Sequence, residues 1–346
     1  MTDPNSSLLD TPDARAVRDL AAQAGWMSDG GTTRPPAARP VASTHGKKRT
    51  RRSGARRGLH ALAFVAGGAL ASAVALTSLL AMPAAAQTAP ADPPRMSHCI
   101  AIADAAPGIE YLHKAAWTDP VPDFGVRIRY VQHSAFLIQA PGGLSAVTDY
   151  NGWLGTADFL PDVVTMNHAH SSHWTANPDP AIPHVLRGWS DTYGEPVDHH
   201  LDLGEMLIRN VSTDIRSMGG VEENGNSIFV FEVAGLCVGH LGHLHHEPND
   251  EQYAALGRLD VLMAPVDGGM TLDLPSMINV VRRLKSSVVL PMHWFSDASL
   301  GWFLDGVRDV FDVRQDGESE ITLTLRDLPS RPTVVVLRPT PLRDGE

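Results

Sequence analysis

The chain contains the segment Asp162-Val-Val-Thr-Met-Asn-His-Ala-His-Ser-Ser-His-Trp174, from which its fold is most readily predicted. The segment begins with residues 162–166, in which Val163, Val164 and Met166 predict a short buried strand. It continues directly into a loop that carries His168, His170 and His173. A loop at the end of a buried strand can direct several side chains into one pocket. Because neutral imidazole is a common ligand of zinc, iron, manganese and copper, the loop predicts a metal site.

Two further groups of histidines also follow predicted strands. The strand 236–239 leads into Gly239-His-Leu-Gly-His-Leu-His-His246, and the strand 288–291 leads to His293. Chance placement does not explain three such groups at strand ends, so we expect them to share one pocket. For the lone His133 the sequence leaves two roles open, one behind the metal ligands and one in the core.

Strand-like and helix-like segments alternate along the rest of the chain. The remaining predicted strands are 126–131, 134–139, 145–148, 227–233 and 261–265, and the predicted helices are 251–256 and 277–284. This alternation is typical of an α/β domain in which helices cover the faces of sheets.

The distribution of charge argues against nucleic acid as a partner. The net charge is −11, but residues 1–86 hold eleven basic and five acidic residues, which leaves residues 87–346 with a net charge near −17. Binding to phosphate depends on clustered Lys and Arg, which an acidic body lacks. The charge therefore disfavours both nucleic acid and an anionic membrane surface as partners.

The N-terminal part has the features of an export signal. Residues 1–57 predict a disordered segment that ends in a basic run, and residues 58–86 predict an apolar signal region with cleavage after Ala86. Paired arginines in the basic run resemble a twin-arginine signal. We expect a periplasmic or secreted protein, with an uncleaved membrane anchor as the alternative. Residues 87–125 are then a linker and N-terminal extension, and residues 126–346 are the globular domain.

The two cysteines, Cys99 and Cys237, do not predict a disulfide framework. They could form one bridge in an exported protein. Cys237, however, lies in an apolar run, which favours a small buried side chain without a disulfide.

These segments resemble the metallo-β-lactamase superfamily, and especially its lactonase-like and phospholipase-like hydrolases. The resemblance rests on residues 131–138 and 147–150, the three histidine loops, and the run from Gly225, and it extends from about Arg127 to His293. It implies a four-layer αβ/βα sandwich with a metal site at one edge of two sheets.

Several ligand positions of the family pattern are changed in this chain. The family loop is His-x-His-x-Asp-His, and here Ser172 stands in place of the aspartate. His243 stands at the position of the bridging aspartate, and only Asp214 is near the position of a further family histidine. The final family histidine is retained as His293.

The loss of carboxylates predicts one metal ion. Two dications would bring four positive charges into the site, and neutral imidazoles offset none of them. The resemblance implies His173, His243 and His293 as the central ligands, with His168 and His170 as added or alternative ligands. Asp149 is expected to orient the loop that carries His168. We expect one zinc ion, with iron or manganese as alternatives.

Three functions are compatible with this pattern. The first is metal-assisted hydrolysis of a small molecule, in which Asp214 or Asp267 replaces the missing aspartate as a base. The second is a catalytically inactive metal-binding pseudoenzyme, and the third is a mononuclear iron oxidoreductase. The pattern does not identify the substrate.

Overall fold

The computed structural model of the chain describes residues 94–101, 116–217 and 220–345. The predictions for residues 1–57 and 58–86, and for most of residues 87–125, concern positions outside this part. None of the helices in the described ranges is long and apolar enough to span a membrane.

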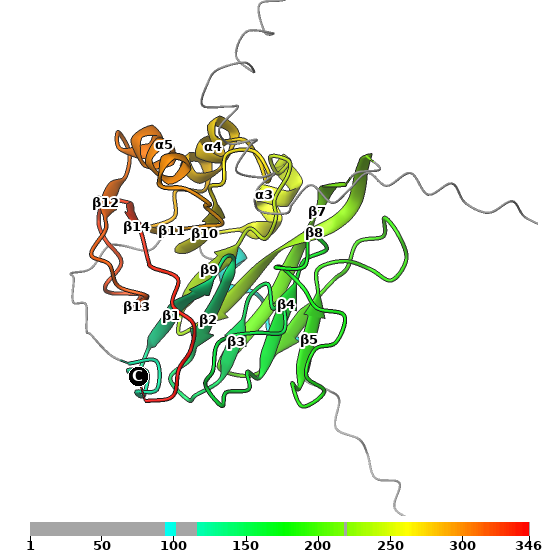
Figure 1. The fold of residues 1–346 in the computed structure, drawn as a ribbon, viewed down its shortest axis with the longest axis vertical. Coiled ribbons are helices and arrows are strands. Elements are labelled where there is room, and N and C mark those ends of the chain that lie inside the picture. The colour runs from blue at the N-terminus through cyan, green and yellow to red at the C-terminus, as the bar shows by residue number, and fades with distance from the viewer. Residues whose placement is uncertain (1–93, 102–115, 218–219, 346) are drawn as a thin grey trace, which may run out of the picture. The chain divides into compact units, whose positions relative to one another are not determined.

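Two mixed β-sheets pack face to face (Figure 1). The first sheet has six strands, which lie in the order β13 (Glu320–Thr324), β1 (Gly125–Gln132), β2 (Ala135–Gln139), β3 (Ser145–Val147), β4 (Val163–Met166) and β5 (His184–Arg187). The second has eight, in the order β12 (Asp312–Arg314), β14 (Thr333–Val335), β11 (Val288–Met292), β10 (Val261–Pro265), β9 (Leu236–His240), β8 (Gly220–Val233), β7 (Met206–Ser217) and β6 (His200–Asp202).

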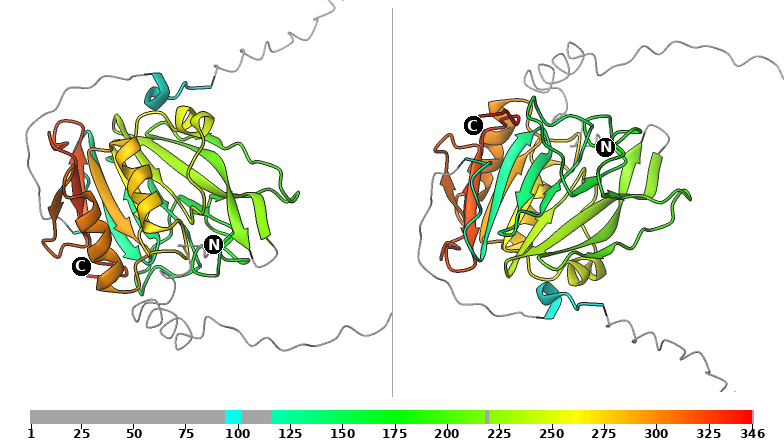
Figure 2. Two further views of the ribbon diagram at one scale, coloured as in Figure 1. Left: turned by 90° about the horizontal axis from the view of Figure 1, so that it is seen from above. Right: turned by 90° about the horizontal axis from the view of Figure 1, so that it is seen from below.

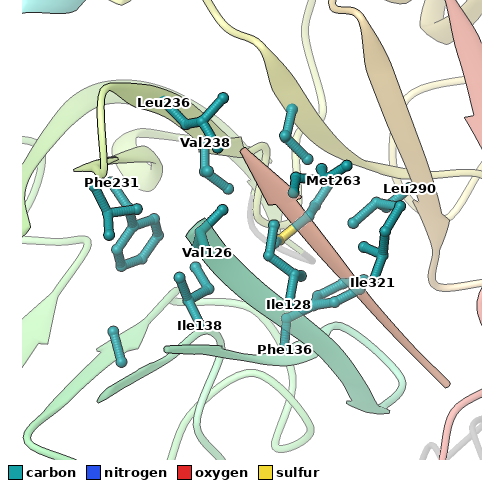
Figure 3. Close-up of a cluster of buried hydrophobic side chains, with 14 of the residues drawn as sticks. Val126, Ile128, Phe136, Ile138, Phe231, Leu236, Val238, Met263, Leu290 and Ile321 are labelled. Atoms are coloured by element: carbon teal, nitrogen blue, oxygen red, sulfur yellow. The ribbon is translucent and has the colours of Figure 1, made fainter. Parts of the chain in front are cut away.

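A continuous apolar layer fills the space between the sheets. Figure 3 shows Ile128 and Phe136 of the six-stranded sheet facing Val238, Met263 and Leu290 of the eight-stranded sheet. All five side chains are fully buried. Burial of such side chains contributes about 1.5–3 kcal/mol each relative to exposure, so this layer holds the two sheets in a fixed relation.

Three helices cover the outer face of the eight-stranded sheet (Figures 1 and 2). They are α3 (Asp250–Leu256), α4 (Leu274–Leu284) and α5 (Asp297–Val307). Each begins at a side chain that accepts a hydrogen bond from the first turn, namely Asn249, Asp273 and Ser296. In the described residues the outer face of the six-stranded sheet is covered by loops, whose Trp117, Tyr150 and Ile182 pack on it. The arrangement confirms the predicted α/β sandwich class.

Every strand and helix predicted in the domain is present within three residues of its predicted bounds, except that β8 begins at Gly220 and not at the predicted residue 227. The elements without a sequence-based prediction are β5, β6, the long strand β7, the short helix α2 (His98–Ala101), helix α5 and the three C-terminal strands.

The carboxyl ends of several strands from both sheets lie at the same end of the sandwich. β9, β10 and β11 are parallel, and they end at His240, just before Asp267, and just before His293, respectively. In the other sheet β3 and β4 are parallel, and they end just before Asp149 and the loop of residues 167–174. The strand directions therefore bring the histidine loops of both sheets to one place.

The expectation that Cys237 lies buried without a disulfide is wrong. Cys99 and Cys237 form a disulfide, with their Cα atoms 5.9 Å apart and 138 residues between them. Cys237 is indeed fully buried in β9. Its partner lies in α2 (His98–Ala101), where the carbonyl of Cys99 accepts a hydrogen bond of 2.9 Å from the backbone of Arg258. The residues next to each cysteine do not indicate that the two cysteines, 138 residues apart, lie together.

The segment that carries Cys99 is also held by polar contacts around Glu232. This buried carboxylate accepts hydrogen bonds from Ser97, at 2.5 Å, and from Arg209, at 2.9 Å. His98 lies 2.9 Å from its other oxygen. The segment around Cys99 is therefore held against strands β8 and β9 by a covalent bond and by polar contacts with the buried Glu232.

We expect the Cys99→Ala/Cys237→Ala variant to lose about 2–5 kcal/mol of unfolding free energy, because the disulfide closes a long loop in the unfolded chain. Urea unfolding followed by circular dichroism measures the loss. A dithiol reductant should lower the unfolding midpoint of the wild type and leave that of the double variant unchanged. An equal effect of reductant on both proteins would contradict the prediction.

Candidate metal centre

Four histidines from both sheets form a compact group, which we call the four-histidine group: His133, His170, His173 and His293. Their potential ligand atoms all lie within 4.8 Å of one another. The Nε2 atoms of His173 and His293 are 3.1 Å apart, and the ring centroids of His133 and His293 are 4.0 Å apart. His173 and His293 are fully buried, while His133 and His170 are partly exposed.

A buried carboxylate lies behind each of the two innermost rings. Asp149 Oδ2 is 2.5 Å from His173 Nδ1, and its Oδ1 accepts a hydrogen bond of 2.9 Å from Asn167. Asp267 Oδ2 is 3.0 Å from His293 Nδ1. Each carboxylate favours a proton on the Nδ1 atom that faces it, which leaves a lone pair on Nε2. Asp149 also contacts the histidine loop at two residues, in the orienting position expected for it.

Asp267 is held firmly by its own turn. Its Oδ1 accepts hydrogen bonds from the backbone of Gly269, Met270 and Thr271, at 2.6–3.0 Å, and its Oδ2 accepts one of 2.5 Å from the Thr271 hydroxyl. Although burial raises the pKa of Asp267, its contacts with His293 and Thr271 lower it below the usual value. Because both of its oxygens already have several hydrogen-bond partners, Asp267 is better suited to positioning His293 than to acting as a base.

Burial favours the neutral form of three imidazoles of the group, those of His133, His170 and His173. It is the largest cause that lowers the pKa of His133 to about 3 and that of His170 to about 4, and the neighbouring His293 adds to both shifts. The same causes lower the pKa of His173 well below its usual value. Burial raises the pKa of Asp149, against the opposing effects of His240 and Asn167. Neutral imidazoles are the form that binds metal ions.

Three residues of the site have strained backbone. His133, Asp149 and His293 have φ values of 41°, 44° and 60°, in the left-handed region that non-glycine residues seldom adopt. The His133 carbonyl accepts hydrogen bonds from the His293 backbone, at 2.9 Å, and from the Tyr130 hydroxyl, at 2.5 Å. These bonds join the two sheets and hold both residues in the strained conformation, as is common at functional sites.

The donor atoms of the group fit a transition metal. The Nε2 lone pairs of His173 and His293 face each other at 3.1 Å, an arrangement that repels unless a cation or proton lies between them. Two nitrogen ligands of a tetrahedral zinc ion lie about 3.3–3.4 Å apart, given Zn–N bonds of about 2.0–2.1 Å. Among the described residues His133 Nε2 is buried without a hydrogen-bond partner, and it borders the same space.

The structure places the sequence-predicted residues in three different surroundings. His170, His173 and His293 lie in the four-histidine group, and His243 lies beside it, with its ring centroid 4.7 Å from that of His173. His168 lies outside the group, with Nδ1 2.8 Å from Glu222 of β8. Asp214 is not a member of the group, and it accepts a hydrogen bond of 3.0 Å from the backbone of Asn224.

His133 belongs to the group, although the sequence left its role open. It directly follows β1, which ends at Gln132, and lies two residues beyond the end of the predicted strand 126–131. Its place at a strand end was therefore the signal that could have identified it.

Two buried asparagines hold the histidine loops at the correct distance from each other. Asn167 accepts a hydrogen bond of 2.7 Å from the Ser227 backbone, and Asn226 accepts one of 2.8 Å from the His243 backbone. Gly242 lies against both, and a Cβ atom there would overlap the Asn167 and Asn226 side chains. Its φ of 61° is also in the left-handed region. Only glycine fits this position without displacement.

Comparison with known families identifies the domain. Residues 127–293 match the family model described as the beta-lactamase superfamily domain, and this range holds all four histidines of the group. This part of the chain belongs to the metallo-β-lactamase superfamily. The match ends at His293, so it includes the whole set of histidine loops and both sheet edges that carry them.

The chain is also similar to named members of the superfamily. A UPF0173 metal-dependent hydrolase of Nanoarchaeum equitans is 23% identical over 185 residues, which are 49% of this chain and 84% of the relative. A UPF0173 metal-dependent hydrolase of Thermoplasma volcanium is 24% identical over 160 residues, which are 40% and 67% of the two chains. A putative Zn-dependent hydrolase of Thermotoga maritima is 26% identical, with a TM-score of 0.44, and the match covers 61% of this chain and 98% of that one.

We expect the chelator-treated protein to lose stability as the pH falls from about 6.5 to about 4. Histidines of the unfolded chain take up protons near pH 6.5, whereas the folded pKa is about 4 for His170 and about 3 for His133. The unfolded state then binds more protons, so the unfolding free energy falls on acidification. Urea unfolding across this range measures the slope. The His170→Gln variant should show a shallower slope, and an unchanged slope would contradict the prediction.

We expect Gly242→Ala to lose roughly 2–5 kcal/mol of unfolding free energy, because a left-handed backbone and overlap with two asparagines add together. Gly143→Ala is the matched control, since Gly143 has a φ of 95° and a Cβ there would meet nothing within 4 Å. The control should lose only the backbone part, about 1–2 kcal/mol. Equal losses in urea unfolding would show that the overlap has no effect.

Proposed function

We propose that the protein is an exported metal-dependent hydrolase with one metal ion in the four-histidine group. The observation that carries the proposal is the convergence of the His173 and His293 lone pairs, each backed by a buried carboxylate. His133 and His170 complete the set of residues that would hold the ion. The related UPF0173 proteins are described as metal-dependent hydrolases, which supports hydrolysis as the reaction class.

The charge of the site supports one divalent ion. With a metal ion bound, ionised Asp149 and Asp267 would together supply two negative charges, and neither has an exposed side chain. Two carboxylates balance one dication, whereas a second ion would bring two further charges into a buried site at high cost. Iron or manganese would satisfy the same charge balance as zinc, and zinc is the ion that we propose.

A bound transition metal would supply Lewis-acid polarisation of a carbonyl or phosphoryl oxygen and a more acidic water molecule. The side chains of this chain orient the donors. Asp149 and Asp267 hold the two innermost rings in one tautomer, which commonly raises the basicity of the ligand nitrogens. Ser172, at the position of the family aspartate, lies 2.7 Å from His170 Nδ1 and so orients that ring.

Export is supported by two features of the chain. Residues 47–86 have the basic, apolar and small-residue order of a secretory signal. The Cys99–Cys237 disulfide is typical of proteins that function in an oxidising compartment. We propose a periplasmic or secreted location, with a small molecule as the substrate.

Metal analysis by plasma mass spectrometry, after purification without chelator, tests the proposal. We expect about one metal ion per chain, and its loss in the His173→Ala/His293→Ala variant. The matched control is His199→Ala/His200→Ala, because these histidines bond to backbone carbonyls of Arg187 and Arg95 and lie outside the group.

The metal-loaded protein would then be assayed with p-nitrophenyl acetate, γ-butyrolactone and bis(p-nitrophenyl) phosphate. Hydrolysis that disappears with the metal would support the enzyme, and metal without turnover would favour an inactive metal-binding protein. Iron with oxygen consumption would favour the oxidoreductase. Two ions per chain would overturn the mononuclear site.

A further inference from the structure

His245 lies next to the four-histidine group, and backbone atoms determine which of its ring nitrogens carries the proton. Its Nδ1 accepts a hydrogen bond from the backbone N–H of Arg216. Its Nε2 lies 2.8 Å from the backbone carbonyl of Met270. A backbone N–H needs a lone pair, and a carbonyl needs a proton. Neutral His245 therefore carries its proton on Nε2.

The tautomer of His245 determines that of His243. His243 Nδ1 lies 3.0 Å from His245 Nε2, the nitrogen that carries the proton. Two N–H groups facing each other would repel, so His243 Nδ1 must present its lone pair. Neutral imidazole has only one N–H. The proton of His243 is therefore on Nε2, on the side of the four-histidine group.

The contact of His243 with the group agrees with this assignment. His243 Nε2 lies 3.2 Å from His170 Nε2, and the Ser172 hydroxyl lies 2.7 Å from His170 Nδ1. The His243 N–H donates to the lone pair of His170 Nε2. If a metal ion were bound to that lone pair, the N–H would donate to another acceptor in the pocket. In either state His243 presents a proton and no lone pair.

We propose that His243 is a neutral hydrogen-bond donor that stabilises negative charge on the carbonyl oxygen of an ester or lactone during hydrolysis. This inference rests on the proposed hydrolytic function, and it gives His243 a role different from the metal ligand that the family pattern predicts. His245 is a positioning residue, because it acts only through the tautomer of His243. An N–H group aimed in advance at developing charge is the basis of oxyanion stabilisation.

The ring of His243 is well fixed for this role. It is 5% exposed, and its backbone donates a hydrogen bond of 2.8 Å to the buried Asn226. A donor that is held in place and largely shielded from water stabilises charge more strongly than the same group in solvent. The neutral donor also avoids adding positive charge beside a metal ion, which a protonated histidine would do.

The tautomer of His243 can be measured directly in the zinc-loaded protein. Nitrogen NMR of ¹⁵N-histidine-labelled protein distinguishes a protonated ring nitrogen from one with a lone pair and from one bound to metal. We expect a protonated Nε2 in both His243 and His245. In the His245→Phe variant we expect the His243 proton to distribute between both ring nitrogens. A His243 Nε2 bound to zinc, with the proton on Nδ1, would overturn the proposal.

Two variants of His243 separate a donor from a ligand. We expect His243→Phe to keep its zinc and to lower kcat for p-nitrophenyl acetate by about 100- to 1,000-fold, with little change in KM. His243→Gln, which retains an N–H donor, should recover part of the loss. His246→Phe, a change in the same loop, is the matched control. Loss of zinc from folded His243→Phe would overturn the proposal.

The outcomes also separate this inference from the proposed function. If the wild type binds no metal ion, the proposed metal-dependent hydrolysis fails. The nitrogen NMR measurement on the same metal-free protein still decides whether His243 Nε2 carries the proton. If zinc binds and His243 is one of its ligands, the proposed function stands and the donor role is wrong.

Discussion

Two buried carboxylates behind two imidazole rings are the constraint on which the rest of the site depends. Asp149 and Asp267 favour protons on the Nδ1 atoms of His173 and His293, on the sides of the rings away from the centre of the group. The two Nε2 atoms, 3.1 Å apart, then face each other with their lone pairs. Without a cation between them the two lone pairs repel each other, so the surrounding structure must hold the two rings in place. The buried layer between the sheets supplies that rigidity, and the His293–His133 backbone bond joins the sheets at the site itself.

Much of the fold and part of the site could be predicted because apolar strands lead directly into histidine loops. Buried strands such as Val163–Met166 and Val288–Met292 are largely apolar, which is visible in the sequence. The convergence of their carboxyl ends follows from parallel pairing. The site of His133 could have been predicted by the same rule. Helix α5 also has a visible signal, since Leu300, Phe303, Leu304 and Val307 have helical spacing.

Other features depend on contacts between distant residues, which no local pattern reports. The family pattern relates His168 and Asp214 to the first metal position, but in the structure they contact Glu222 and Asn224 of the long β7–β8 hairpin. The hairpin has a register shift between Thr213 and Ile215. The spacing of histidines in the sequence does not predict the course of this hairpin. The tautomers of the histidines likewise depend on which backbone groups happen to face each ring.

The contact of Gly242 with Asn167 and Asn226 has a consequence for how such a site can change over generations. The three residues fill one another's space, so a larger side chain at any of them requires compensating changes at the other two. Substitutions there are therefore expected to be tolerated in combination and rejected singly. Phe295 and Met270, which lie beside His293 and His245, have exposed side chains and form a rim at the site, where a change of size needs less compensation. Selection for new substrates would then be expected to change the rim residues first and to leave Asn167, Asn226 and Gly242 unchanged.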